Sequence, residues 1–194
     1  MRITGGAARG IPIQTGRAKH VRPATDRLRE AVFSSLGERV NGAVFLDLFA
    51  GSGSYGLEAL SRGAASGLFV EKHPQAVHAL EDNLRAVRKS IGSGGTPSPA
   101  DGKDSLSLNV IRRDVLRFDS RLRFDLIFMD PPYDLARSDG DRLLQIARRS
   151  LAEDGLLVFE LPGDMAIPSS GWTLVRRLGK EGTNEPSVVL LESG

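Results

Sequence analysis

The sequence predicts an α/β domain in which helices cover both faces of a mostly parallel sheet. Three observations predict this fold. Short apolar runs alternate with helical patterns along most of the chain, a glycine-rich turn follows the first run, and no helical pattern separates the last two runs. Strand–helix–strand units place consecutive strands parallel, whereas the last two runs are typical of an antiparallel hairpin.

The N-terminal part is predicted to differ from the rest of the chain. In residues 1–20, two short extended runs flank a glycine-rich turn, which indicates a basic hairpin or arm. The remaining residues, 21–194, suit one domain. Its first helix is expected after Pro23, with Thr25 as the N-cap and Gly37 just past its end.

The other elements alternate along the chain. We expect strands at residues 43–49, 66–71, 107–111, 124–129 and 155–161, and a closing hairpin at residues 172–178 and 187–192. Helices are expected at residues 54–62, 75–87 and 141–151. Residues 92–107 are rich in Gly, Ser and Pro, which predicts a flexible surface insertion.

Basic residues gather near the N-terminus, although the net charge of the chain is only +2. Residues 1–30 hold seven Lys and Arg side chains against two acidic ones, which gives this segment a net charge of +5. Such a segment suits an anionic partner, and we expect Arg2, Arg9 and Arg22 to contact it. The alternative is a solvated basic arm without a partner.

The composition excludes several classes of protein and site. The chain has no cysteine, so disulfides, cysteine-ligated metals and thiol nucleophiles are excluded. The longest apolar runs are far shorter than a membrane span, and no secretory signal is visible. We therefore expect a cytoplasmic protein without a metal site or a membrane partner.

A glycine-rich turn follows the first predicted strand. Gly51, Gly53 and Gly56 match the pattern G-x-G-x-x-G between a strand and a helix, where glycines let the backbone approach a ligand closely. Glu71 ends the next strand, at the place where an acid accepts hydrogen bonds from ribose hydroxyls. The turn therefore predicts a cofactor that contains adenosine.

Two further acids bear on the identity of this cofactor. Asp47 stands near the end of the first strand, where it would repel a pyrophosphate but suit an amino-acid tail with a sulfonium. The alternative is that Asp47 only caps the turn by accepting backbone amides. Asp114 follows the third strand, where it either accepts from the adenine amine or serves as an ordinary turn residue.

The fourth predicted strand ends in Asp130-Pro131-Pro132-Tyr133. Two consecutive prolines end a strand and force a rigid turn. The Asp130 carboxylate and the Pro131 carbonyl then offer two acceptors beside the aromatic ring of Tyr133. This arrangement suits an aromatic NH2 group, because two acceptors localise the nitrogen lone pair for attack on a methyl sulfonium while the ring fixes the plane of the base.

Several segments of the chain resemble a known family. They are residues 1–6, residues 22–30 (Arg-Pro-Ala-Thr-Asp-Arg-Leu-Arg-Glu), the glycine turn with the residues up to 64, and residues 130–133. Together they resemble the bacterial RsmD family of 16S ribosomal RNA guanine-N2 methyltransferases, and the segment 22–30 is the most specific match. The resemblance covers nearly the whole chain.

The resemblance implies a Rossmann-like fold with seven strands in the order 3-2-1-4-5-7-6 and an antiparallel last strand. It implies S-adenosylmethionine (SAM) as cofactor and 16S rRNA as partner, within a 30S assembly intermediate, bound by a monomer. The cofactor residues that it implies are Asp47, Phe49, Gly51, Ser52, Gly53, Glu71, Lys72, Asp114 and Val115. It places Asp130, Pro131 and Tyr133 at the target guanine, and Thr25, Asp26 and Arg29 close to them.

The sequence alone leaves three other functions open. A DNA adenine-N6 methyltransferase fits the Asp130–Tyr133 corner equally well, but it usually needs a larger region that reads sequence. A catalytically silent module that binds SAM or RNA would keep the same turn. A nicotinamide oxidoreductase fits the glycine pattern alone. Methylation of pyrimidine carbon 5 is disfavoured, because that chemistry usually needs a cysteine nucleophile.

Overall fold

The computed structural model describes residues 1–15, 23–92, 108–167 and 171–194, and the side chains of residues 23–25 are not described. The predicted insertion therefore lies outside the described residues except for Gly92, and so does Arg22. The strands are β1 Val44–Leu48, β2 Ser66–Glu71, β3 Asn109–Arg112, β4 Phe124–Met129, β5 Leu151–Pro162, β6 Trp172–Gly179 and β7 Pro186–Ser193. The helices are α1 Pro23–Leu36, α2 Ser54–Ser61, α3 Pro74–Ile91 and α4 Tyr133–Ser150, with two short 3-10 helices, η1 Gly37–Val40 and η2 Val115–Arg117.

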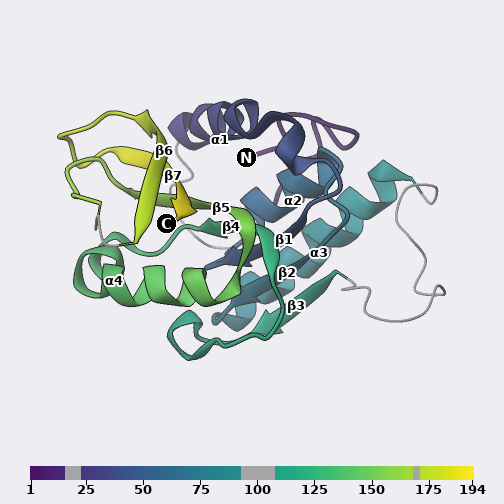
Figure 1. The fold of residues 1–194 in the computed structure, drawn as a ribbon. Coiled ribbons are helices and arrows are strands. Elements are labelled where there is room, and N and C mark those ends of the chain that lie inside the picture. Colours follow the sequence, from purple (N-terminus) through teal and green to yellow (C-terminus); the bar gives the residue numbers. More distant parts are fainter. Residues whose placement is uncertain (16–22, 93–107, 168–170) are drawn as a thin grey trace.

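All seven strands form one sheet in the order β3-β2-β1-β4-β5-β7-β6 (Figure 1). The first five strands pair in parallel, and β7 runs antiparallel to both of its neighbours, β5 and β6. The predicted fold class is therefore confirmed, including the strand order. The order reverses between β1 and β4, and ligands in such sheets bind at the carboxyl ends of the strands beside that point.

The two faces of the sheet bury separate apolar clusters. One face packs against α1, α2 and α3, which lie together on one side of the sheet in Figure 1, and its centre includes Phe45 and Phe128. The other face packs mainly against α4 and η2 and includes Met129 and Phe159. Because side chains alternate along a strand, consecutive residues of β4 belong to opposite clusters.

The N-terminal segment is a hairpin that packs onto the domain. Arg2 and Pro12 form an antiparallel bridge, and the Ile3 side chain is fully buried in the core. The hairpin also bonds to α2, because the Ala7 amide donates to the carbonyl of Ser61 over 2.7 Å. This segment is therefore fixed to α2 over the residues that the structure describes.

Several predicted boundaries differ from those of the structure, and the largest differences at the start of an element are at α1, α4 and β5. Helix α1 begins at Pro23, so Thr25 lies inside its first turn and is no N-cap; proline is well suited to a first turn because it lacks the amide that would stay unbonded there. Helix α4 begins at Tyr133, eight residues before the predicted start at residue 141. The prediction missed its first part because Asp139 is non-helical and interrupts the apolar periodicity. Strand β5 likewise begins at Leu151 and follows α4 directly.

Candidate active site

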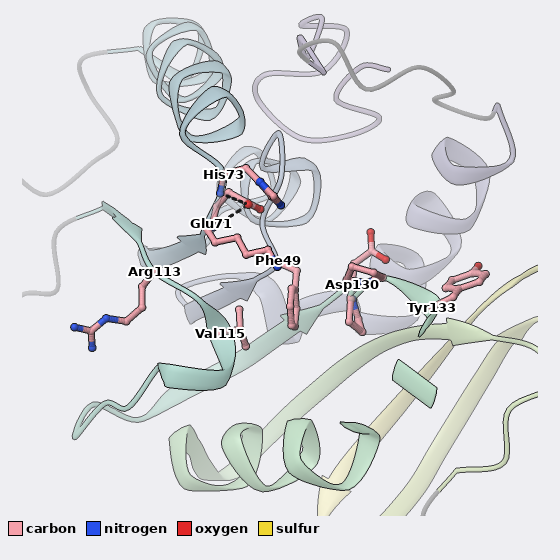
Figure 2. Close-up of a pocket in the computed structure, with 10 residues that line it drawn as sticks. Phe49, Glu71, His73, Arg113, Val115, Asp130 and Tyr133 are labelled. Carbon is pink, nitrogen blue, oxygen red and sulfur yellow. Dashed lines mark hydrogen bonds between the residues drawn. The ribbon is translucent and has the colours of Figure 1, made fainter. Parts of the chain in front are cut away.

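A pocket of about 390 Å³ opens at the carboxyl ends of the central strands (Figure 2). Its lining comes from the turn after β1, the ends of β2 and β3, and the corner between β4 and α4. The lining residues are Phe49, Glu71, Lys72, His73, Arg113, Val115, Asp130, Pro131, Pro132 and Tyr133. The predicted glycine turn and the Asp130–Tyr133 corner thus meet in one cavity.

The turn after β1 has an unusual backbone conformation. Phe49 has a φ of 60°, the only positive φ of a non-glycine residue among those described, and its ring lies in the pocket (Figure 2). This conformation is costly for a residue with a Cβ, and such residues are concentrated at functional sites. Gly53 has a φ of 83°, and a Cβ there would lie 2.3 Å from a methyl group of Leu80. The turn is therefore tightly specified by its residues.

Glu71 is a buried acceptor at the end of β2. One oxygen accepts the Gly51 amide over 2.9 Å, and the other accepts the amides of Lys72 and His73, both over 2.8 Å (Figure 2). Three backbone donors fix the carboxylate against the glycine turn. Oε2 accepts only one of these bonds, so it keeps acceptor capacity, and Glu71 is suited to hold a ribose at the pocket wall.

Asp47 is buried beneath the same turn. Its Oδ2 accepts the Gly56 amide over 2.9 Å, at the start of α2. Burial raises the pKa of Asp47 to about 7, the bond from Gly56 opposes this rise, and the charge of Glu71 adds to it. Asp47 therefore does support the turn, as the alternative interpretation held, and it is absent from the residues that line the pocket.

Asp130 follows β4 and lies between Phe49 and Tyr133 in Figure 2. Its carboxylate is open to the pocket, but protein surrounds the pocket floor. Burial there, together with the charges of Glu160 and Asp47, holds the pKa of Asp130 well above its usual range. Water in the open pocket opposes this effect, so we expect its full size only when ligands fill the cavity.

Four acids form a row across the sheet at this edge. Strand register places Glu71, Asp47, Asp130 and Glu160 on the face that α1 and α2 cover, on β2, β1, just after β4, and on β5. The charge of Glu71 raises the pKa of Asp47, and the charges of Asp47 and Glu160 raise the pKa of Asp130. A row of acids in a poorly solvated place favours a ligand with positive charge, such as a sulfonium.

The remaining predicted residues lie in several places. Asp114 caps η2 by accepting the Leu116 amide over 3.0 Å, while Val115 lines the pocket. Arg2 and Arg9 line a second cavity of about 430 Å³, between the hairpin and α1. The other residues of that cavity are Ile3, Thr4, Gly10, Asp26, Arg27 and Glu30.

Arg29 is the predicted residue whose surroundings differ most from those of a surface cation. It is 2% exposed, and its guanidinium donates to the Arg2 carbonyl over 2.6 Å and to Asp26 over 3.0 Å. Its Nε lies 3.5 Å from the buried carboxylate of Glu58. Arg29 thus links α1, the hairpin and α2 inside the protein.

His73, Arg113 and Glu160 were not predicted from the sequence as site residues. His73 and Arg113 line the pocket, and each stands directly beside a predicted site residue, Lys72 or Asp114, just past the end of a strand. In Figure 2, Arg113 points away from Asp130. Glu160 falls inside the predicted fifth strand. The signal that could have identified it is the presence of an acid in an otherwise apolar strand.

Comparison with known proteins defines the family. A family model described as "Conserved hypothetical protein 95" matches residues 1–187. The chain is 30% identical over 175 residues to "Putative rRNA methyltransferase YlbH" of Bacillus subtilis, which covers 90% of both chains. It is 29% identical to "Ribosomal RNA small subunit methyltransferase D" of Haemophilus influenzae, over 91% of this chain and 86% of the relative. The chain belongs to the RsmD family of methyltransferases.

Solved structures of similar proteins agree with this assignment. "Putative methyltransferase yhhF" of Escherichia coli superposes with a TM-score of 0.76 at 27% identity, over 100% of this chain and 97% of that one. A hypothetical protein of Thermus thermophilus gives a TM-score of 0.70 at 31% identity, over 99% of both chains. The RsmD resemblance and its implied fold are thus confirmed. In this RsmD-family member, no helix within the described ranges has the length and apolarity to cross a bilayer.

Proposed function

We propose that the protein transfers a methyl group from SAM to the exocyclic N2 amine of a guanine in 16S ribosomal RNA. The observation that carries this proposal is the single pocket that Glu71 and Phe49 share with Asp130 and Tyr133. One half suits an adenosine, and the other half suits a planar base with an amine. The names of the relatives support ribosomal RNA as the substrate.

The cofactor half would use residues from three strand ends. Glu71 would accept from the ribose hydroxyls, Phe49 and Val115 would hold the adenine, and Asp114, just past the third strand, would accept from its amine. The other proposed contacts are Asp47, Gly51, Ser52, Gly53 and Lys72. When bound, SAM supplies an electrophilic methyl group on a sulfonium, and the row of acids favours that positive charge.

The target half would position the amine. Asp130 and the Pro131 carbonyl accept its two hydrogens, and Tyr133 stacks on the base, so that the nitrogen lone pair points at the methyl group. Most of the rate gain then comes from orientation and from fixed acceptors, which need no reorganisation during the reaction. Thr25 and Asp26, on α1, complete our proposed substrate contacts near this corner.

Substrate binding would use the N-terminal hairpin. Arg2 and Arg9 are exposed and line one cavity with Arg27, so they can face phosphates. Arg22 joins them in the proposal, whereas the burial of Arg29 favours an indirect role through the hairpin. A guanine must leave its stack to reach Tyr133, which favours a loop or a 30S assembly intermediate over an intact duplex. We propose that a monomer acts on it.

Methyl transfer from radiolabelled SAM tests the proposal. We expect label in 16S rRNA or 30S particles, with N2-methylguanine after digestion, and none in duplex DNA. Label in DNA adenine alone would favour the second candidate, since the Asp130 corner accepts that amine too. The Asp130→Ala variant should lose at least about 100-fold in kcat, because it removes an acceptor at the reacting nitrogen. SAM binding without transfer to any nucleic acid would indicate a silent module.

A further inference from the structure

Glu160 is the acid of the row that the proposed mechanism does not use. It stands on β5, one position beyond the last residue pair that joins β4 to β5, and Asp130 is the matching position after β4. Adjacent parallel strands lie about 4.8 Å apart, and side chains at matching positions point to the same face. The register therefore places the two residues side by side, with both side chains on the same face of the sheet.

The surroundings of Glu160 hold it in that position. The carboxylate is 8% exposed, and its Oε2 accepts the Tyr55 hydroxyl over 2.8 Å. Tyr55 comes from α2 and stacks on Phe128, with ring centroids 5.5 Å apart. On β7, the residue paired with Glu160 is Val188, so no charged partner reaches it from that strand. The Tyr55 hydroxyl therefore fixes the orientation of the Glu160 carboxyl group but, as a neutral donor, does not cancel its charge.

We propose that Glu160 and Asp130 form a carboxyl pair that shares one proton and takes up the proton released by the methylated amine. The inference rests on the proposed methyl transfer at Asp130. Glu160 is in this view a positioning residue that acts through Asp130, and Tyr55 orients it. Of the two residues, Asp130 lines the pocket and Glu160 lies behind it.

The step balances in atoms and charge. The nitrogen lone pair forms the N–C bond, and the electrons of the broken C–S bond remain on sulfur. The nitrogen then carries a positive charge and loses one proton to Asp130. The pair begins with one proton and one negative charge, so it becomes neutral. It returns that proton to water when the products leave.

The charges around the pair are consistent with this role. Burial, and then the charge of Glu160, raise the pKa of Asp130, and Asp47 adds to the rise. Burial also raises the pKa of Glu160, while Tyr55 and Arg29 oppose that rise. Glu160 is buried and Asp130 is open to the pocket, and two neighbouring carboxylates cannot both ionise easily, so the pair titrates in two separate steps.

Carbon-13 NMR of the side-chain carboxyl groups tests the pair in the free protein, without SAM or RNA. We expect the Asp130 signal to titrate in two steps in the wild type, and Glu160 to report both steps. In the Glu160→Gln variant, Asp130 should titrate once, at a pH between the two wild-type steps. The Glu153→Gln variant is a matched control, because it changes an exposed acid at the far end of β5. A single step for wild-type Asp130 would overturn the proposal even if a variant failed to fold.

The pH dependence of methyl transfer gives the second readout. A second proton adds less readily to a pair that already shares one than to a single buried carboxylate. The acid limb of kcat should therefore move to higher pH in Glu160→Gln, with the KM for SAM within about twofold of the wild type. A lower kcat in Glu160→Gln, with the acid limb of its pH profile at the same pH as in the wild type, would show that Glu160 has only a structural role and would overturn the inference. Two-step titration in a protein that methylates no RNA would contradict the proposed function and leave the pair intact.

Discussion

Asp47 is buried below the glycine turn, where its carboxylate accepts one backbone amide. Its bond from Gly56 favours the ionised carboxylate, but burial outweighs that bond and raises the pKa to about 7. The folded protein therefore holds a proton on Asp47 at pH values where the unfolded chain, with a pKa near 3.8, has released it. This difference links the stability of the fold to pH.

We predict that the Asp47→Asn variant loses part of the pH dependence of stability between about pH 4 and pH 7. In the wild type, a carboxyl with a raised pKa contributes fully below pH 4, and its contribution falls as the pH rises to 7. Asparagine can still accept the Gly56 amide through its oxygen, so the turn is kept. Urea unfolding at several pH values measures the difference. A variant curve parallel to that of the wild type across this range would contradict the prediction.

At the scale of the elements, the attachment of the N-terminal hairpin to α2 depends on one buried carboxylate, that of Glu58. Glu58 is fully buried and accepts the amides of Thr4 and Gly5, both over 2.8 Å. The Arg62 side chain donates to it over 2.8 Å, and Arg29 lies on its other side. The two amides and Arg62 donate to Glu58, and Arg29 forms an ion pair with it, so its two oxygens hold the hairpin, α1 and α2 together.

We predict that Glu58→Gln destabilises the fold by about 3–5 kcal/mol, because the new NH2 group faces donors and the ion pairs of Glu58 with Arg29 and Arg62 are lost. The measurement is chemical denaturation, combined with hydrogen exchange of the Thr4 and Gly5 amides, which should exchange faster. Glu81→Gln on the exposed side of α3 is the matched control and should change stability by less than about 0.5 kcal/mol. Equal stabilities of the two variants would refute this account of the hairpin.

Nucleic-acid binding belongs to the scale of the whole molecule, because phosphate contacts add up over a surface. We predict that the Arg2→Ala/Arg9→Ala double variant lowers the slope of log K against log salt for RNA binding by about one per arginine. SAM affinity should stay unchanged, since neither side chain lines the pocket of Phe49 and Asp130.

Arg39→Ala provides the control for this measurement. Arg39 is exposed and pairs with Glu192 over 3.0 Å, at the amino edge of the sheet and away from the hairpin. Its removal should leave the salt slope as in the wild type. Equal slopes for all three proteins would show that the hairpin does not bind phosphates.

The sequence by itself determined the strand order expected from the family, the glycine turn and the Asp130–Tyr133 corner. The strand order was implied by the family resemblance, whereas the turn and the corner rest on local chemistry: glycines and prolines restrict the backbone over a few residues, and apolar periodicity marks which segments are buried. Strands β2 and β4 match their predicted bounds for this reason. The family match adds the methyltransferase class, which periodicity alone cannot supply.

Only the tertiary structure decided which distant residues meet. The start of α4 was hidden because Asp139 breaks the periodicity, and the left-handed backbone of Phe49 has no sequence signal. Strand register brings Glu160 beside Asp130, and packing buries Arg29 between α1, the hairpin and α2. Register and burial depend on contacts between segments far apart in the chain, which no local pattern encodes.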